Sequence, residues 1–106
     1  MAPTSVNYAD VEPTAGALHF LRDELDCDRL GFTVLECEPG WEGMEHDHAD
    51  DDHEEIYYLV EGSATVDVDG EELSMDPGDA VHLGPEETRQ IRNDDEPSTF
   101  VLAGAP

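Results

Sequence analysis

Three of the five histidines in this sequence lie within one acidic stretch, residues 40–55. His46 and His48 are two positions apart, so on an extended strand both side chains point to the same face, about 6.6 Å apart along the chain. Two imidazoles placed in this way can bind one divalent cation at about 2.0–2.1 Å. The pair therefore predicts a metal site, with zinc, iron, manganese or nickel as the candidate ions.

Glu55 is the candidate third ligand. It shares strand parity with Tyr57 and Leu59, within a run that we expect to form a strand buried on both faces. A carboxylate that faces a barrel interior needs a compensating charge. A metal ion on His46, His48 and Glu55 would supply that charge, and Tyr57 on the same face could orient a ligand, although packing is its simpler use.

The remaining histidines have simpler explanations than catalysis. His53 is expected to be a solvated loop residue rather than a replacement ligand, and His19 a packing residue on a short apolar segment. His82 lies between Val81 and Leu83, which we expect to face the core, so His82 would point outward. The four serines lie outside the histidine cluster, which leaves a serine triad unsupported.

Strands must position these side chains. Short apolar or alternating runs are separated by turn signals rich in Gly, Pro and Asp, and Asp69-Gly70 supplies the positive backbone angles of a two-residue hairpin turn. This pattern predicts an all-β barrel or sandwich of short strands. The expected strands cover residues 32–35, 56–60, 64–68, 71–75, 80–83, 88–92 and 99–102.

The N-terminal third is organised differently. We expect residues 1–30 to form an arm and edge segment that packs on a barrel made by residues 31–106. Met1–Glu12 has little periodicity and should become ordered only by docking. Ala15–Leu25 fits either a helical turn or an edge strand, because Leu18, Leu21 and Leu25 follow helical spacing but Phe20 interrupts it.

Composition limits the partners. The chain has 106 residues, enough for one domain, and its 28 acidic against 4 basic residues give a formal net charge of −24. Such a charge makes nucleic acid and anionic membranes unsuitable partners and favours a halophilic, haloarchaeal-like protein whose self-repulsion is screened by molar salt. No apolar stretch of membrane-spanning length and no secretory leader is visible, which favours a cytoplasmic location with reduced Cys27 and Cys37.

The histidine stretch resembles the first motif of the cupin family. Gly40, His46, His48, Glu55 and Gly62 match its glycine, His-x-His pair, glutamate and closing glycine. The spacer of six residues between His48 and Glu55 is longer than is usual in the family. An added loop would absorb this difference.

Residues 78–93 resemble the second cupin motif, with Gly78-Asp79 at its start and Asn93 at its end. The proline of the motif is displaced to Pro85, and the last metal-binding histidine of the family is replaced by Arg89. Arginine donates five hydrogen bonds and cannot bind a metal ion.

The resemblance, which covers Gly31–Leu102, implies a small cupin-type jelly-roll β-barrel, often a homodimer, with any site in the barrel mouth. Three functions stay open. One is a structural homodimer whose pocket is vestigial, and the other two use the pocket. In one, His46, His48 and Glu55 hold a metal ion and Arg89 faces a small organic substrate, as in a metalloenzyme. In the other, Arg89 pairs with Glu55 without any metal, and the mouth binds or senses a small ligand whose carboxylate or phosphate Arg89 receives. Whether the protein is an enzyme is left open.

Overall fold

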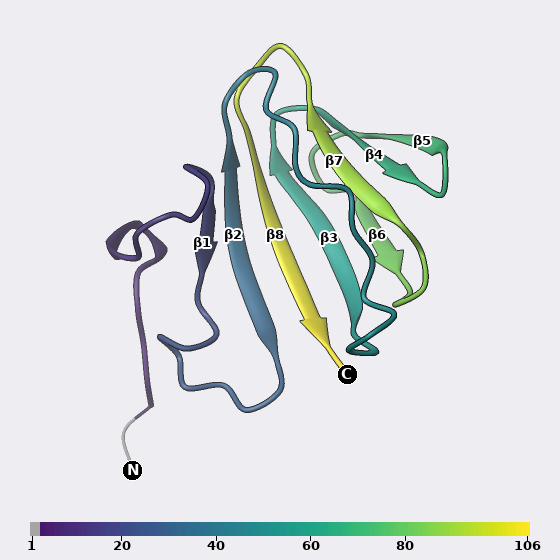
Figure 1. Ribbon diagram of the computed structural model, residues 1–106. Coiled ribbons are helices and arrows are strands. Elements are labelled where there is room, and N and C mark those ends of the chain that lie inside the picture. The colour runs from purple at the N-terminus through teal and green to yellow at the C-terminus, as the bar shows by residue number, and fades with distance from the viewer. Residues whose placement is uncertain (1–2) are drawn as a thin grey trace.

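Two antiparallel sheets form the molecule (Figure 1). This computed structural model describes residues 3–106. The larger sheet has the order β1-β2-β8-β3-β6 and the smaller one β5-β4-β7. The elements are the 3-10 helix η1 (Tyr8–Asp10) and the strands β1 (Leu18–Phe20), β2 (Gly31–Cys37), β3 (Glu54–Glu61), β4 (Ala64–Val68), β5 (Glu71–Met75), β6 (Ala80–Leu83), β7 (Arg89–Asn93) and β8 (Ser98–Ala105).

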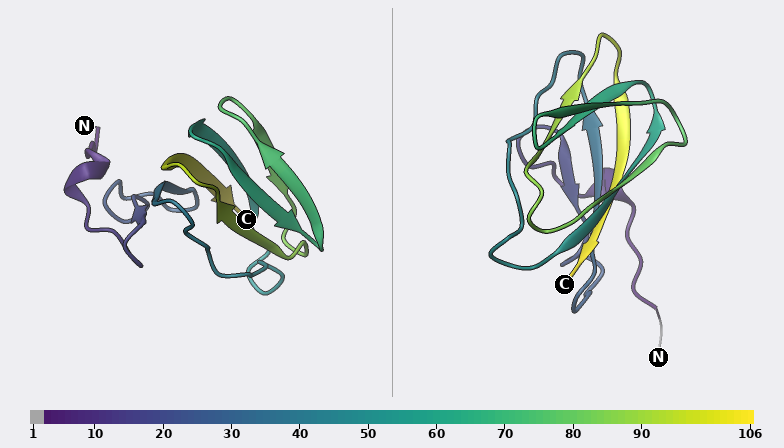
Figure 2. Two further views of the ribbon diagram at one scale, coloured as in Figure 1. Left: turned by 90° about the horizontal axis from the view of Figure 1, so that it is seen from above. Right: turned by 90° about the vertical axis from the view of Figure 1, so that its right-hand side faces the viewer.

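The two sheets face each other as layers, which is clearest in the views of Figure 2. Within residues 3–106 there is no α-helix, and the described part of the chain offers no helix long and apolar enough to cross a membrane. The all-β jelly-roll fold is therefore confirmed, and the strands lie close to the positions that the alternating sequence pattern predicts.

The core lies between the layers. Leu35, Leu59 and Phe100 from the larger sheet and Val66 from the smaller one are fully buried there. Burial of each such side chain contributes about 1.5–3 kcal/mol relative to exposure. This contact fixes the two sheets against each other and so holds the ends of β3 and β7 together.

The outer face of β3 differs from the expectation. Ile56, Tyr58 and Val60 are 48%, 42% and 46% exposed, so β3 is not buried on both faces. In an antiparallel sheet one face packs on the core and the other faces outward, and here the outer face carries apolar residues. The homodimer stays a prediction.

The hairpin between β4 and β5 confirms the predicted turn. Val68 pairs with Glu71, and Asp69 and Gly70 between them have φ of 49° and 84°. Both central residues thus have the positive φ of a two-residue turn whose twist suits the flanking strands.

The N-terminal segment adds an edge strand, which settles the choice that the sequence left open. β1 pairs with β2, so that His19 lies opposite Val34. His19 is buried, its Nδ1 lies 2.7 Å from the Val11 carbonyl oxygen, and Tyr8 meets its ring edge to face. The arm docks through these contacts, as a packing role for His19 predicts, while residues 1 and 2 of the expected arm lie outside the described part.

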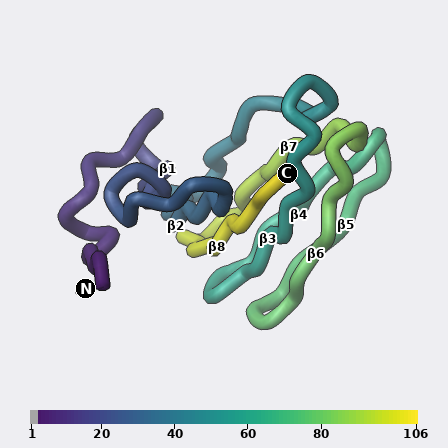
Figure 3. The backbone as a smooth tube through the Cα atoms, turned by 90° about the horizontal axis from the view of Figure 1, so that it is seen from below, coloured from purple at the N-terminus to yellow at the C-terminus, as the bar shows by residue number. Residues whose placement is uncertain are grey.

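The segment from 38 to 53, between β2 and β3, runs beside β7 and positions the site. Glu42 forms an antiparallel bridge with Arg92, and His46 forms one with Arg89. Figure 3 shows this stretch leaving β2 and passing close to β7 before it turns into β3. Pairing with β7 of the smaller sheet thereby brings the histidines of this segment to the end of β7 where Arg89 lies.

Candidate metal centre in the barrel mouth

The two histidines converge, but on a different scaffold from the one expected. They lie in the connecting segment rather than on a regular strand. His46 is fixed by two backbone hydrogen bonds with Arg89, of 2.8 and 2.9 Å, and the His48 amide donates to the Pro85 carbonyl at 2.8 Å. Their rings meet edge to face with centroids 5.2 Å apart.

Glu55 completes the cluster from the start of β3. Its Oε1 lies 3.0 Å from His48 Nε2, and ligand atoms of His46, His48 and Glu55 all lie within 4.8 Å of one another. Two imidazoles and one carboxylate are a donor set that suits a divalent transition metal ion and leaves coordination positions open. The residues present therefore fit such an ion.

Gly104 makes room for Glu55, a contact that the sequence analysis missed. Glu55 pairs with Gly104 across β3 and β8, and a Cβ at position 104 would lie 2.9 Å from the Glu55 Cγ. A glycine inside a strand often marks such a close approach, which was the available signal.

Asp51 is a second residue that the sequence analysis missed. Both of its carboxylate oxygens lie 3.1 Å from His48 Nδ1. Desolvation acts to raise the pKa of the Asp51 carboxyl, but the hydrogen bond and charge of His48, with help from His53, hold this pKa below its ordinary value. The His48 ring therefore has a carboxylate at each nitrogen, Glu55 on one side and Asp51 on the other.

Arg89 is fully buried and makes one side-chain hydrogen bond, from Nη2 to the Gly84 carbonyl at 3.0 Å. Its Nε and Nη1 have no hydrogen-bond partner among residues 3–106. The alternative in which Arg89 pairs with Glu55 is wrong for this structure, since the ion pairs of the described residues include none with Arg89. The guanidinium turns toward Gly84, and the Glu55 carboxylate meets His48.

Tyr57 faces the interior beside Glu55, as strand parity predicts. It is buried, and its hydroxyl makes a long contact of 3.5 Å with Glu55 Oε1. Burial and then the Glu55 charge raise the pKa of the Tyr57 phenol, against the opposing effect of Arg89. The phenol therefore keeps its proton and can donate it in a hydrogen bond.

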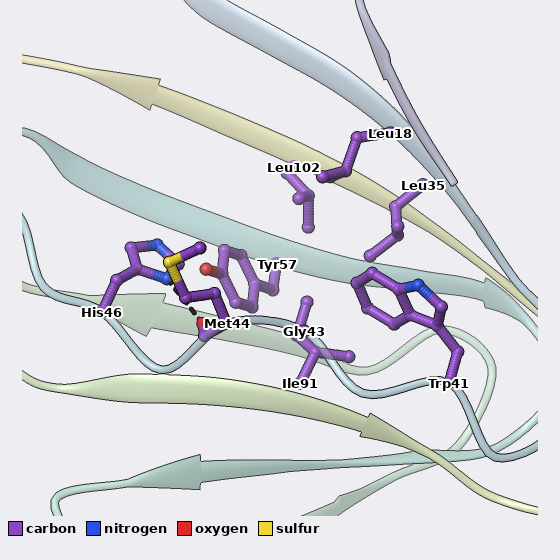
Figure 4. A pocket seen from close by; sticks show the side chains of 9 residues that line it. All are labelled: Leu18, Leu35, Trp41, Gly43, Met44, His46, Tyr57, Ile91 and Leu102. Carbon is purple, nitrogen blue, oxygen red and sulfur yellow. Dashed lines mark hydrogen bonds between the residues drawn. The ribbon is translucent and has the colours of Figure 1, made fainter. Parts of the chain in front are cut away.

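A small apolar cavity of about 120 Å³ adjoins these groups. Figure 4 shows His46 and Trp41 at opposite ends of the lining residues, with Tyr57 between them. Trp41 both lines the cavity and packs against the core. Typical ligand pockets measure about 300–1,000 Å³, so this space admits only a small group.

The other two histidines of this part of the barrel, His82 and His53, have different surroundings. His82 points outward and lies 2.8 Å from Glu54 Oε1, as its place between Val81 and Leu83 predicts. His53 differs from a plain solvated residue, because its ring centroid lies 5.9 Å from that of His48 and its Nδ1 lies 3.8 Å from Asp51 Oδ2.

Comparison with known families decides the classification of the chain. The family model described as "Cupin domain" (Cupin_2) matches residues 33–104. The chain belongs to the cupin family. The match spans both motifs, and a search of curated proteins gives no significant match to this cupin.

Solved structures agree with the fold. A cupin protein from Bacteroides fragilis is 25% identical, with 95% of this chain and 86% of that one covered and a TM-score of 0.78. A Cupin 2 conserved barrel domain protein from Salinispora arenicola is 20% identical over 100% and 89% of the two chains, with a TM-score of 0.72.

A third similar structure has a named activity. It is described as a sugar phosphate isomerase from a cupin superfamily, from Silicibacter pomeroyi, and is 26% identical with a TM-score of 0.73. The alignment covers 84% of this cupin and 58% of that protein, so a large part of that chain has no counterpart here.

Proposed function

We propose that this cupin binds one divalent metal ion in its barrel mouth through His46, His48 and Glu55. The observation that carries the proposal is the convergence of their ligand atoms within 4.8 Å, from the segment before β3 and from β3 itself. Zinc, iron, manganese and nickel all suit imidazole and carboxylate ligands. The half-buried Glu55 supplies a negative charge that a cation would compensate.

We propose further that the mouth takes a small anionic organic ligand. Arg89 is fully buried and has two nitrogens without partners in the part of the chain that the structure describes, and a planar guanidinium suits a carboxylate or phosphate. The named activity of the Silicibacter pomeroyi protein supports a phosphorylated ligand as one member of this class. The apolar cavity beside Tyr57 would hold the small organic part and exclude water.

Within such a complex each residue has a defined task. A bound ion would polarise an oxygen of the ligand as a Lewis acid. Tyr57 keeps its proton and can donate a hydrogen bond to the ligand or to Glu55, and Arg89 orients the anionic end. This arrangement fits a metalloenzyme acting on a small substrate.

A second candidate function is a non-catalytic module that binds or senses the anion without metal. The two Arg89 nitrogens that lack partners among residues 3–106 favour it, because they call for an anion whether or not a metal ion is bound nearby. Ligand-dependent stability without turnover would be its property.

Metal content tests the first proposal. Untagged protein purified in molar KCl without chelator is compared by mass spectrometry with His48→Ala and with His82→Ala, which removes an exposed histidine on the outer face. We expect near one metal ion per chain in the natural sequence and in His82→Ala, and loss in His48→Ala. Equal metal in all three proteins, or none, would contradict the metal site.

Thermal unfolding tests the second candidate. Inorganic phosphate should raise the Tm of the natural protein at constant ionic strength, and the rise should disappear in Arg89→Met. A rise that survives this substitution would show that Arg89 is not the anion receptor.

We also propose that the protein works as a homodimer in a saline cytoplasm. The net charge of −24 supports the salt requirement, and the exposed Ile56, Tyr58 and Val60 support an interface on the outer face of the larger sheet. Analytical ultracentrifugation in molar KCl should give a dimer that Tyr58→Lys weakens. A monomer at every concentration would contradict the dimer.

A further inference from the structure

The added loop between His48 and Glu55 folds back on His48. The His48 carbonyl accepts hydrogen bonds from the amides of Asp51 and Asp52, at 3.2 and 2.8 Å, and Asp52 has a positive φ of 56°. This closed turn carries the Asp51 carboxylate to the outer edge of the His48 ring. His53, which ends the turn, brings a second ring to the same carboxylate.

His48, Asp51 and His53 thus form an outer group of metal ligands. One ligand atom from each lies within 4.8 Å of the others, the two rings are tilted by 34°, and both ring side chains are 23% exposed against 51% for Asp51. The inner group, His46, His48 and Glu55, lies at the opposite edge of the same imidazole.

We propose that this outer group is a second site for a divalent transition metal ion, and that it excludes occupation of the inner site because both use His48. The ligands are again two imidazoles and one carboxylate, which suit zinc, nickel or copper. The inference shares His48 with the proposed function, but the outer site does not require the inner one.

Exclusion follows from the chemistry of a neutral imidazole, which has one lone pair and one N–H. If the ion lies on Nε2 with His46 and Glu55, the Nδ1–H donates to Asp51 at the observed 3.1 Å. If the ion lies on Nδ1 with Asp51 and His53, the Nε2–H donates to Glu55 at the observed 3.0 Å. Each carboxylate is therefore a ligand in one state and a hydrogen-bond acceptor that orients the ring in the other.

The inner site should be preferred when both are intact, because the side chain of its carboxylate, Glu55, is 17% exposed against 51% for Asp51 in the outer group. An ion at the inner site would also compensate the charge of this half-buried Glu55. The outer site should then be seen when the inner ligands are removed.

Titration calorimetry with Ni²⁺ on the full chain separates the two sites. The buffer contains molar KCl and excess Mg²⁺, a hard cation that occupies surface carboxylates but competes poorly for imidazole. The proteins are the natural sequence, the inner variant His46→Ala/Glu55→Gln, the outer variant Asp51→Asn/His53→Gln, and the combination of all four substitutions. Asp50→Asn/Asp52→Asn is the matched control, since it removes the same loop's other carboxylates.

We expect one Ni²⁺ per chain in the natural protein, in both single-site variants and in the loop control, and none in the fourfold variant. The inner variant should bind Ni²⁺ through the outer site, about 10-fold to 100-fold more weakly than the natural protein. This is the range typical for the loss of groups that support metal ligands.

The outcomes that overturn the inference are distinct from those that overturn the proposed function. An inner variant that binds no Ni²⁺, beside an outer variant that does, would remove the outer site and leave the proposed function standing. An outer variant that binds none, beside an inner variant that does, would leave the outer site and remove the proposed one. Two ions on the natural chain would overturn exclusion.

A second measurement covers the case in which a variant folds poorly. Zinc-loaded natural protein, labelled with ¹⁵N, shows by long-range proton–nitrogen correlation which ring nitrogen of His48 carries the proton. We expect Nδ1–H in the natural protein and Nε2–H in His46→Ala. The same protonated nitrogen in both would contradict the exchange between sites.

Discussion

The two ends of β7 each carry a buried polar side chain, and their surroundings differ completely. At one end, Asn93 donates from Nδ2 to the carbonyls of Glu38 and Glu96, at 2.6 and 2.9 Å, and its Oδ1 accepts from the Ser98 hydroxyl at 2.6 Å. At the other end, Arg89 makes one side-chain hydrogen bond and keeps two nitrogens without partners among the described residues.

This difference indicates a structural role for the Asn93 end of β7 and a functional role for the Arg89 end. The Asn93 end lies where β7 leads into β8, at the top of Figure 1, and there a polar side chain closes the barrel by satisfying the backbone around it. Buried polar groups are almost always hydrogen-bonded in this way. The Arg89 end, beside the histidines, instead retains hydrogen-bonding capacity, which is what a ligand site needs.

The largest effect on stability should come from a substitution at the Asn93 end of the barrel, at Gly62. Its φ is +90°, and a Cβ there would lie 2.5 Å from the Pro97 carbonyl oxygen. Gly62→Ala should lower the free energy of unfolding by about 3 kcal/mol, from backbone strain and overpacking together. Gly70→Ala is the matched control, because Gly70 also has a positive φ but open space around it. Equal losses in urea unfolding would show that the close contact is unimportant.

Removing the Asn93 network should have the next largest effect. Asn93→Ala leaves buried carbonyls and the Ser98 hydroxyl without partners, so the free energy of unfolding should fall by about 2 kcal/mol. Metal content should not change, because the substitution lies at the opposite end of β7. Urea unfolding in molar KCl measures the first quantity and mass spectrometry the second; a loss of metal would contradict the separation of the two ends.

Arg89→Met should act in the opposite direction. It replaces a buried cation that has no ion-pair partner among residues 3–106 by an apolar side chain of similar length, so the free energy of unfolding should rise by about 1 kcal/mol. The same urea titration, without phosphate, measures it. A loss as large as that of Asn93→Ala would show that Arg89 is a structural residue like Asn93, and the comparison would fail.

The smallest effect should be a change in the rate of thiol labelling. Burial raises the pKa of the Cys37 thiol to about 11, only partly offset by its hydrogen bond with Ser98. The folded protein should therefore react with a thiol reagent at Cys27, which is partly exposed, and at Cys37 only on unfolding. In a Cys27→Ser background, Asn93→Ala should speed the labelling of Cys37. An unchanged rate would indicate that the network does not close this end.

Much of the fold was predictable because it follows local rules. Alternation located most strands, Asp69-Gly70 fixed the hairpin, and the parity of Glu55 with Tyr57 placed both on the inner face. The apolar outer face of β3 was not predicted correctly, because a run of apolar residues looks the same whether one or both faces are covered.

The candidate site was predictable only in part. Spacing brought His46, His48 and Glu55 together, although on a loop rather than a strand. The place of Asp51 depends on a turn that closes on the His48 carbonyl, and the direction of Arg89 depends on the Gly84 carbonyl across the next turn. Both contacts are local, but each depends on the conformation of one turn, which residue spacing alone does not specify.

The most direct test of the central claim is a crystal structure of the full chain grown in molar salt with Zn²⁺, with an anomalous difference map measured at the zinc edge. The account predicts one strong peak about 2.0–2.1 Å from ring nitrogens of His46 and His48, in contact with the Glu55 carboxylate. A map with peaks only at surface carboxylates, or with no peak in the barrel mouth, would contradict it.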